Sequence, residues 1–139
     1  MNSTKRRFID ANLIMYSLGG SHPLRDPCKK ILAAIKSNAF IPVTNTEVLQ
    51  EVLYRYFSIR RSLLGEIAYQ SLVQLCAQIY PVTLRETDLA LELLKKYQSI
   101  TSRDAIHAAT MINSGIKEII STDPHFDAIS EIKRIDPSN

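Results

Sequence analysis

Several common features of proteins are scarce or absent in this 139-residue chain. It has no tryptophan, only four glycines, and no apolar stretch near the roughly 20 residues that a membrane-spanning helix needs. The sparse glycine and the 45% of apolar residues are not typical of a fibrous or disordered chain. The basic N-terminal residues precede only a short apolar stretch, which does not indicate a signal peptide. We therefore expect a cytoplasmic protein with no membrane segment.

The two cysteines, Cys28 and Cys76, stand far apart, with no C-x-x-C pair and no histidine at zinc-ligand spacing. This pattern argues against a disulfide framework and against a structural zinc site. We expect two reduced and mostly buried thiols.

The length suits a single domain spanning residues 1–139, with a core of its own. A formal net charge of +3 permits contact with a polyanion, but it does not establish one. Strand-like and helical segments alternate, which predicts an α/β fold with a mainly parallel sheet. The expected strands are 6–10, 39–43, 79–82, 116–121 and an edge strand at 132–135, and the expected helices are 11–18, 24–37, 44–56, 62–78, 83–97 and 102–114.

Four acidic residues are candidates for a shared site, because each falls at a strand end or in the first turns of a helix: Asp10, Glu51, Asp104 and Asp123. Ligands of open parallel sheets bind in the crevice beyond the carboxyl ends of the strands. Carboxylates gathered there repel one another unless a cation is present. The pattern therefore indicates a site for Mg²⁺ or Mn²⁺.

Structural explanations compete for the first two acids. Asp10 suits a helix N-cap, although Asn12 places a second oxygen near it and favours a metal-binding turn. Glu47 is interpreted as part of a capping box with Thr44. Glu51 has no such explanation, and its sequence context leaves open whether it pairs with an arginine one turn away or binds a metal.

The later acids also have structural explanations. Asp104 suits the third position of a helix capped by Thr101, and we expect His107, one turn further on, to lie outside the metal site. Asp123 can form a turn with the backbone that follows it. Together with the hydroxyl of Thr122, it also suits coordination of a hard cation.

The motifs around these acids resemble those of the PIN-domain family. They are Phe8-Ile9-Asp10-Ala11-Asn12, Glu51-Val52-Leu53-Tyr54, Arg103-Asp104-Ala105-Ile106-His107-Ala108-Ala109 and Ile120-Ser121-Thr122-Asp123-Pro124-His125-Phe126. Within the family, the chain looks similar to ribonuclease toxins of the VapC type or their archaeal relatives, over essentially its whole length.

The resemblance implies a three-layer α/β/α fold and a Mg²⁺- or Mn²⁺-dependent endoribonuclease. Asp10, Glu51, Asp104 and Asp123 match the catalytic, metal-binding acids of the family, and Asn12 and Thr122 match polar positions beside them. The resemblance also implies an RNA substrate, an antitoxin partner and a homodimer. Where such toxins carry Ser or Thr ahead of the helix acid, this chain has Asn45 and Thr46.

Two other functions compete with this interpretation. A phosphoryl-transfer hydrolase with Asp10 as nucleophile would need a second acid at Asn12, where an amide cannot act as a general acid. A non-catalytic module that binds RNA or protein would use the acids only as helix caps. For the apolar helix residues Val48, Leu49, Tyr56 and Leu63, the default expectation is a place in the core.

Overall fold

The computed structural model describes residues 4–139 and contains a five-stranded sheet in which every neighbouring pair of strands is parallel. The strands are β1 (Arg6–Ile9), β2 (Ile41–Asn45), β3 (Gln78–Tyr80), β4 (Glu118–Ile120) and β5 (Lys133–Ile135), in the spatial order β3-β2-β1-β4-β5. The helices are α1 (Ala11–Leu18), α2 (Arg25–Lys36), α3 (Thr46–Ser58), α4 (Ser62–Leu75), α5 (Leu84–Lys96) and α6 (Ser102–Ser114), and a 3₁₀ helix, η1, covers Pro124–Ala128.

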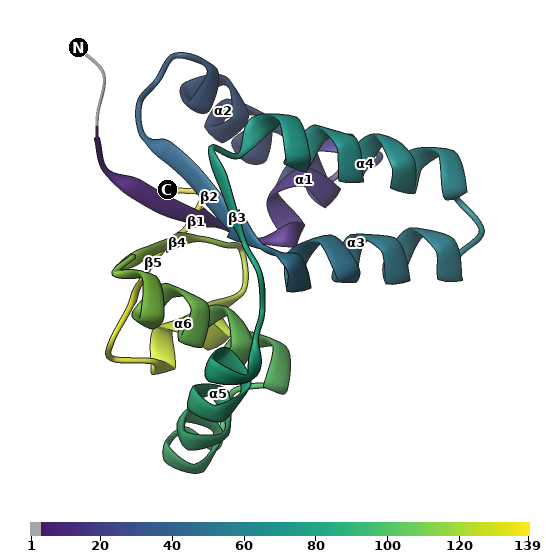
Figure 1. Ribbon diagram of the computed structural model, residues 1–139. Coiled ribbons are helices and arrows are strands. Elements are labelled where there is room, and N and C mark those ends of the chain that lie inside the picture. Colours follow the sequence, from purple (N-terminus) through teal and green to yellow (C-terminus); the bar gives the residue numbers. More distant parts are fainter. Residues whose placement is uncertain (1–3) are drawn as a thin grey trace.

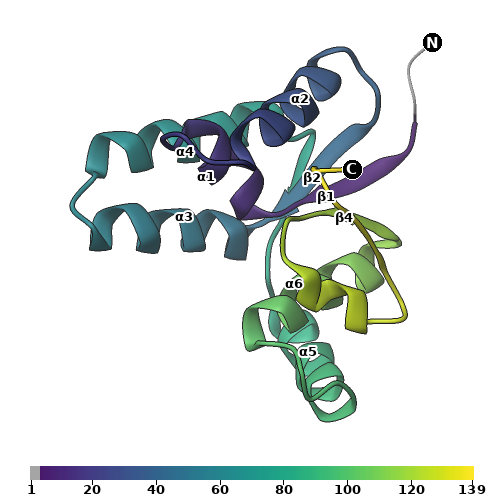
Figure 2. The same cartoon turned by 180° about the vertical axis from the view of Figure 1, so that it is seen from behind.

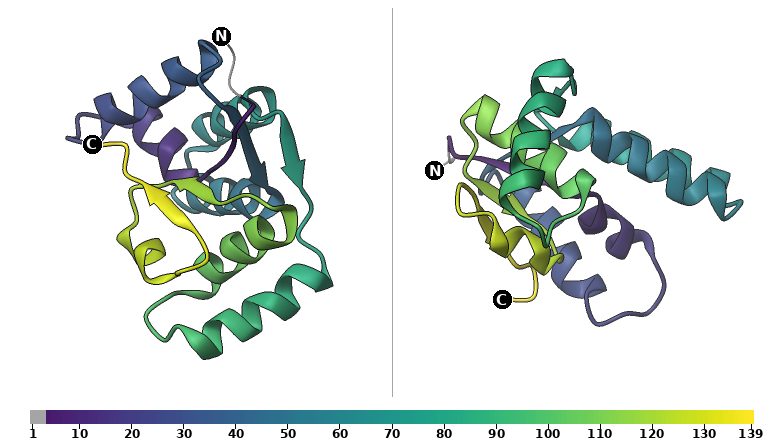
Figure 3. Two further views of the ribbon diagram at one scale, coloured as in Figure 1. Left: turned by 90° about the vertical axis from the view of Figure 1, so that its left-hand side faces the viewer. Right: turned by 90° about the horizontal axis from the view of Figure 1, so that it is seen from below.

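The elements form three layers, with the sheet in the middle. Helices α1 to α4 lie on one side of the sheet, and α5 and α6 lie on the other (Figure 1). The left view of Figure 3 shows the same separation, with the green helices below the strands. Helices α3 and α4 pack against each other as a hairpin that projects away from the sheet (Figure 2). The expected α/β/α architecture is confirmed.

The central strands supply the core. Phe8, Ile9, Val43 and Ile119 have no exposed surface, which is expected of parallel strands covered on both faces. Helix α6 is followed by the C-cap residue Gly115, whose φ of 71° is the left-handed conformation that glycine adopts without strain. Strand β4 begins three residues later, at Glu118.

The expected start of the third helix is wrong by two residues. Thr44 and Asn45 belong to β2, where they pair with Ile79 and Tyr80 of β3, and the helix begins at Thr46. Asn45 is the N-cap, since its side-chain oxygen accepts a hydrogen bond from the Val48 amide at 3.0 Å. The capping box expected between Thr44 and Glu47 therefore does not form.

The core position expected for Leu63, in α4, is also wrong. The helix ends at Leu75, and its buried positions are Gly65, Ala68 and Leu72. The side chains of Leu63 and Ile67 are 71% and 44% exposed. Gly65 brings α4 so close to α3 that Leu63 and Ile67 face outward rather than into the core.

Both cysteines are free and buried, as expected. Across residues 4–139, none of the helices combines the length and the apolar character needed to cross a membrane.

Candidate metal centre

The candidate site lies where the chain reverses its direction of travel across the sheet. From β1 the chain moves outward through β2 to β3, and it then returns to place β4 on the other side of β1. Asp10 follows β1, and its amide donates a hydrogen bond to the carbonyl of Ile120 at the end of β4. Such a switch point opens a crevice at the carboxyl ends of the strands, where parallel α/β proteins bind ligands.

Asp10 is buried, with 5% of its surface exposed, the same fraction as Asp104. Its Oδ1 accepts from the Ala11 amide at 2.8 Å, and its Oδ2 accepts from Ser121 Oγ at 2.6 Å and from Asn12 Nδ2 at 3.2 Å. Burial raises the pKa of Asp10, while His107 and the Ser121 hydroxyl oppose that rise without cancelling it. The helix-cap interpretation of Asp10 is thus confirmed, because its side chain accepts from the first amide of α1.

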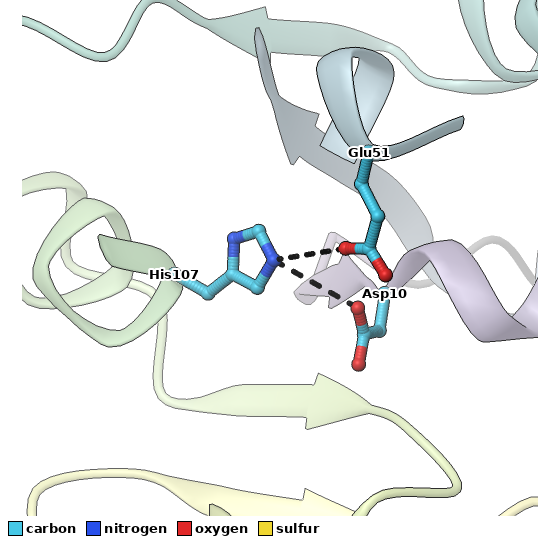
Figure 4. Close-up of side chains that lie close together, drawn as sticks. All are labelled: Asp10, Glu51 and His107. Atoms are coloured by element: carbon cyan, nitrogen blue, oxygen red, sulfur yellow. Dashed lines mark ion pairs between the residues drawn. The ribbon is translucent and has the colours of Figure 1, made fainter. Parts of the chain in front are cut away.

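Glu51 and His107 meet Asp10 from the two helical layers (Figure 4). His107 Nε2 lies 3.8 Å from Asp10 Oδ1 and 4.0 Å from Glu51 Oε1. Both His107 Nε2 and Glu51 Oε1 are buried and have no hydrogen-bond partner among residues 4–139. Buried polar atoms without partners are rare, so this pair needs a chemical explanation.

Asp104, Asp123 and His125 form a second group beside the first. His125 Nδ1 lies 3.5 Å from Asp104 Oδ2 and 3.3 Å from Asp123 Oδ1. Asp104 occupies the expected capping box, because it accepts from the Thr101 amide at 2.9 Å. Asp123 accepts from the His125 amide at 2.9 Å, as expected of a turn-forming aspartate.

One pocket of about 220 Å³ joins the two groups. Its lining includes all four predicted acids together with Asn12, Thr101, Arg103, His107 and His125. Arg103 stands at its edge, with Nε 3.3 Å from Glu47 and 3.6 Å from Glu51. The ion-pair partner of Glu51 is therefore Arg103 of another helix.

The predicted supporting residues hold the two strand ends together. Asn12 Oδ1 accepts from the Thr122 amide at 3.3 Å, so Thr122 takes part through its backbone. The hydroxyl that contacts the cluster belongs instead to Ser121, which also accepts from the Asp123 amide at 3.0 Å. The signal that could have identified Ser121 is its position directly after the buried strand that ends at Ile120.

Sequence reasoning missed two further residues and left a third aside. It did not single out His125 or the capping role of Asn45, and it placed His107 outside the site. The spacing of Asp104 and His107, three residues apart on one helix, is a signal that both side chains lie on the same face.

The donor set suits a hard divalent cation. Carboxylate and amide oxygens from four separate parts of the chain converge on one pocket, and Mg²⁺ and Mn²⁺ prefer such ligands. One carboxylate oxygen each from Asp10 and Glu51 lies within 4.8 Å of His107, and the same limit holds for the group of Asp104, Asp123 and His125.

The fold and this cluster of acids define a known class of protein. The PIN domain family model matches residues 7–132, and the chain belongs to this family.

Curated relatives of similar length are similar to this chain in sequence. The chain is 32% identical to the VapC ribonuclease Mb1869c of Mycobacterium bovis over 127 residues, which are 91% of this chain and 97% of the relative.

Solved structures share the fold at lower sequence identity. The chain aligns with a TM-score of 0.74 to Mycobacterium tuberculosis VapC20, a toxin that cleaves the sarcin-ricin loop, at 19% identity, over 88% of this chain and 94% of that one. It also aligns with a toxin-antitoxin complex from Klebsiella pneumoniae, with a TM-score of 0.67 and 15% identity, over 94% of this chain and 97% of that one.

Proposed function

We propose that this protein is a Mg²⁺- or Mn²⁺-dependent endoribonuclease and the toxin of a toxin-antitoxin pair. The observation that carries the proposal is the convergence of Asp10, Glu51, Asp104 and Asp123 on one pocket at the switch point of the sheet. Family membership and the ribonuclease relatives support it. Asp10, Glu51, Asp104 and Asp123 are the proposed catalytic and metal-binding residues.

Each of the four acids has a proposed role in binding the ion or orienting a water molecule. Asp10 is the proposed central ligand, because it is buried and its orientation is fixed by hydrogen bonds from Ser121 and Ala11. Asp104 and Asp123 close the other side of the pocket, and Glu51 binds the ion or orients a water molecule. A divalent cation held by these residues would supply Lewis-acid chemistry, through which the scissile phosphate would be polarised and the pKa of a bound water lowered.

Arg103 and Arg55 are the basic residues best placed to guide RNA. Arg103 lines the pocket, and Arg55 lines an adjoining cavity of about 350 Å³ that shares Asn12 and Glu51 with it. Lys5 and Arg7 lie at the amino end of β1, away from the pocket, where both pair with a glutamate of β4. If the two arginines contact phosphates, RNA binding weakens steeply with salt, whereas a flat salt response contradicts this role.

The test is cleavage of a panel of structured RNAs by wild type and by Asp104→Asn, purified identically. We expect cleavage only with Mg²⁺ or Mn²⁺, and a loss of about 100-fold or more in the variant, equivalent to about 3 kcal/mol of transition-state stabilisation. The control is Glu92→Gln, which removes the same charge from an exposed acid of α5. No cleavage, or equal cleavage by wild type and Asp104→Asn, would favour the non-catalytic binding module.

An exposed apolar surface supports a protein partner. The α3–α4 apolar surface consists of Leu53, Tyr54, Phe57, Ile59, Leu63 and Ile67, whose side chains are 40% to 71% exposed. Exposed apolar side chains on neighbouring helices are typical of protein interfaces. We assign this surface to protein partners and propose both a homodimer and an antitoxin complex.

Two measurements test these partners separately. Light scattering of the purified chain is expected to give the mass of a dimer, and a monomer at micromolar concentration contradicts the homodimer. Expression of wild type in a bacterial host is expected to arrest growth, and Asp104→Asn is expected not to. Equal growth of both cultures contradicts the toxin.

A further inference from the structure

The ring of His107 is surrounded by groups that define which of its nitrogens carries hydrogen. Its side chain is 1% exposed and lies between Phe8 and Phe126, with ring centroids at 5.2 Å and 6.4 Å. His107 Nδ1 lies 3.2 Å from Asn45 Nδ2. The opposite ring nitrogen, Nε2, faces Asp10 and Glu51.

The orientation of the Asn45 amide follows from its own partners. Its oxygen accepts from the Val48 amide at 3.0 Å, so the NH₂ group must be the part that faces His107. Asn45 Nδ2 also lies 2.9 Å from Thr110 Oγ1, whose hydroxyl donates to the carbonyl of Ile106 at 2.9 Å. Thr110 therefore accepts one amide hydrogen, and the other is directed at His107 Nδ1.

A hydrogen on His107 Nδ1 would face the amide hydrogens of Asn45. Nδ1 is therefore the acceptor, and the hydrogen of the ring lies on Nε2. A nitrogen that carries hydrogen cannot ligate a metal. From this geometry we infer that His107 is a positioning residue, which directs an N–H at Asp10 and Glu51 and leaves the cation an all-oxygen site. This inference rests on the proposed function in one respect, because it takes from that proposal that a cation binds at this site.

The arrangement accounts for an otherwise unexplained pair of atoms. His107 Nε2 and Glu51 Oε1 are both buried without a hydrogen-bond partner in residues 4–139, and they lie 4.0 Å apart. A donor N–H that faces two carboxylates attracts both of them and orients them toward the pocket. A histidine ligand would favour Zn²⁺, whereas oxygen ligands favour Mg²⁺ and Mn²⁺. Asn45 thus influences metal choice from outside the coordination sphere.

The direct test is the position of the ring hydrogen in wild type. Long-range ¹H–¹⁵N correlation spectra of the ¹⁵N-histidine-labelled full chain distinguish protonated from unprotonated ring nitrogens, and His107→Gln identifies the signals of His107. We expect hydrogen on Nε2 and none on Nδ1, both without metal and with saturating Mg²⁺. Hydrogen on Nδ1 in either spectrum overturns the inference.

A substitution at Asn45, the residue that faces His107 Nδ1, is expected to move the ring hydrogen to the other nitrogen. In Asn45→Asp, one carboxylate oxygen still accepts from the Val48 amide, while the other accepts hydrogen from His107 Nδ1. Nε2 then has a free lone pair, and calorimetry is expected to show Zn²⁺ binding about 10-fold tighter or more than in wild type. If the ring hydrogen moves to Nδ1 in this variant but the Zn²⁺ affinity does not change, then Asn45 does not prevent His107 Nε2 from binding the metal, and the inference is contradicted.

Two substitutions at His107 separate positioning from simple packing. His107→Gln retains an N–H donor and is expected to keep wild-type affinity for both Mg²⁺ and Zn²⁺. His107→Leu is expected to lose about 10-fold or more in Mg²⁺ affinity. Loss of Zn²⁺ affinity in His107→Gln would identify His107 as a ligand and overturn the inference.

The outcome for His107 is separate from the outcome for the ribonuclease. Hydrogen on Nε2 in a protein that cuts no RNA supports the orientation of His107 and contradicts the proposed function. Hydrogen on Nδ1 in a metal-dependent ribonuclease contradicts the orientation of His107 and supports the proposed function.

Discussion

Ser121 Oγ donates a hydrogen bond of 2.6 Å to Asp10 Oδ2, and this contact joins the ends of β1 and β4 at the centre of the candidate site. The two residues are 111 positions apart in the sequence. The same hydroxyl oxygen accepts from the Asp123 amide, so a single side chain orients two of the four acids.

The first prediction concerns Ser121→Ala. Removal of the hydroxyl leaves a buried carboxylate oxygen and a backbone amide with fewer partners, which is expected to lower the free energy of unfolding by about 1–3 kcal/mol. Urea denaturation measures this change. The control is Ser58→Ala at the exposed end of α3, expected to stay within about 0.5 kcal/mol of wild type. Equal stability of the two variants would contradict the role of Ser121.

The second prediction concerns stabilisation by metal. A ligand that binds only the folded state, and whose free concentration is about ten times its Kd, adds about 1.4 kcal/mol to the free energy of unfolding. For a chain of this size, that corresponds to a rise in Tm of roughly 5 °C. Thermal denaturation with Mn²⁺ measures the rise, which Asp10→Asn is expected to abolish. If Asp10→Asn is stabilised as much as wild type, the ion binds elsewhere.

The third prediction concerns pH. Burial raises the pKa of Asp10, so on acidification this carboxylate takes up a proton at a higher pH than an exposed aspartate does. Cation binding requires the carboxylate form, and a proton bound to the metal-free site competes with the ion. Calorimetry is therefore expected to show Mn²⁺ affinity falling as the pH is lowered from neutral through the acidic interval in which this carboxylate takes up its proton. An affinity that stays constant over this interval would show that Asp10 is not a ligand.

The fourth prediction concerns the close packing of α3 and α4. A Cβ added at Gly65 would lie 2.8 Å from Cβ of Tyr56, an atom that cannot move without its helix. Gly65→Ala is expected to destabilise the fold by about 1–3 kcal/mol, which urea denaturation measures. Gly20→Ala is the matched control, because a Cβ there meets nothing within 4 Å. A Gly65→Ala variant as stable as the Gly20→Ala control would show that the helices can separate at no cost.

Much of the site could be predicted because its acids follow local signals. Asp10 follows a short apolar strand, and Asp104 lies three residues after a capping threonine. These signals do not depend on tertiary contacts. Burial of the strands and the rule for parallel sheets then place the strand-end acids on one edge.

The remaining features depend on how separate elements pack. Thr44 and Asn45 can both cap a helix, and only pairing of β2 with β3 decides that Asn45 does so. Leu63 follows the helical periodicity of an apolar face, but the close approach at Gly65 turns it outward. His107 reaches the acids because its ring packs against Phe8, a contact between residues 99 positions apart that spacing alone does not reveal.

Anomalous diffraction from crystals soaked in Mn²⁺ tests the central claim most directly, because it locates the ion without reference to activity. The account predicts an anomalous peak in the pocket, about 2.0–2.6 Å from carboxylate oxygens of Asp10 and at least one other of the four acids. It also predicts that His107 Nε2 lies beyond bonding distance of the peak. The absence of a peak among the acids, or a peak bonded to His107 Nε2, would contradict the account.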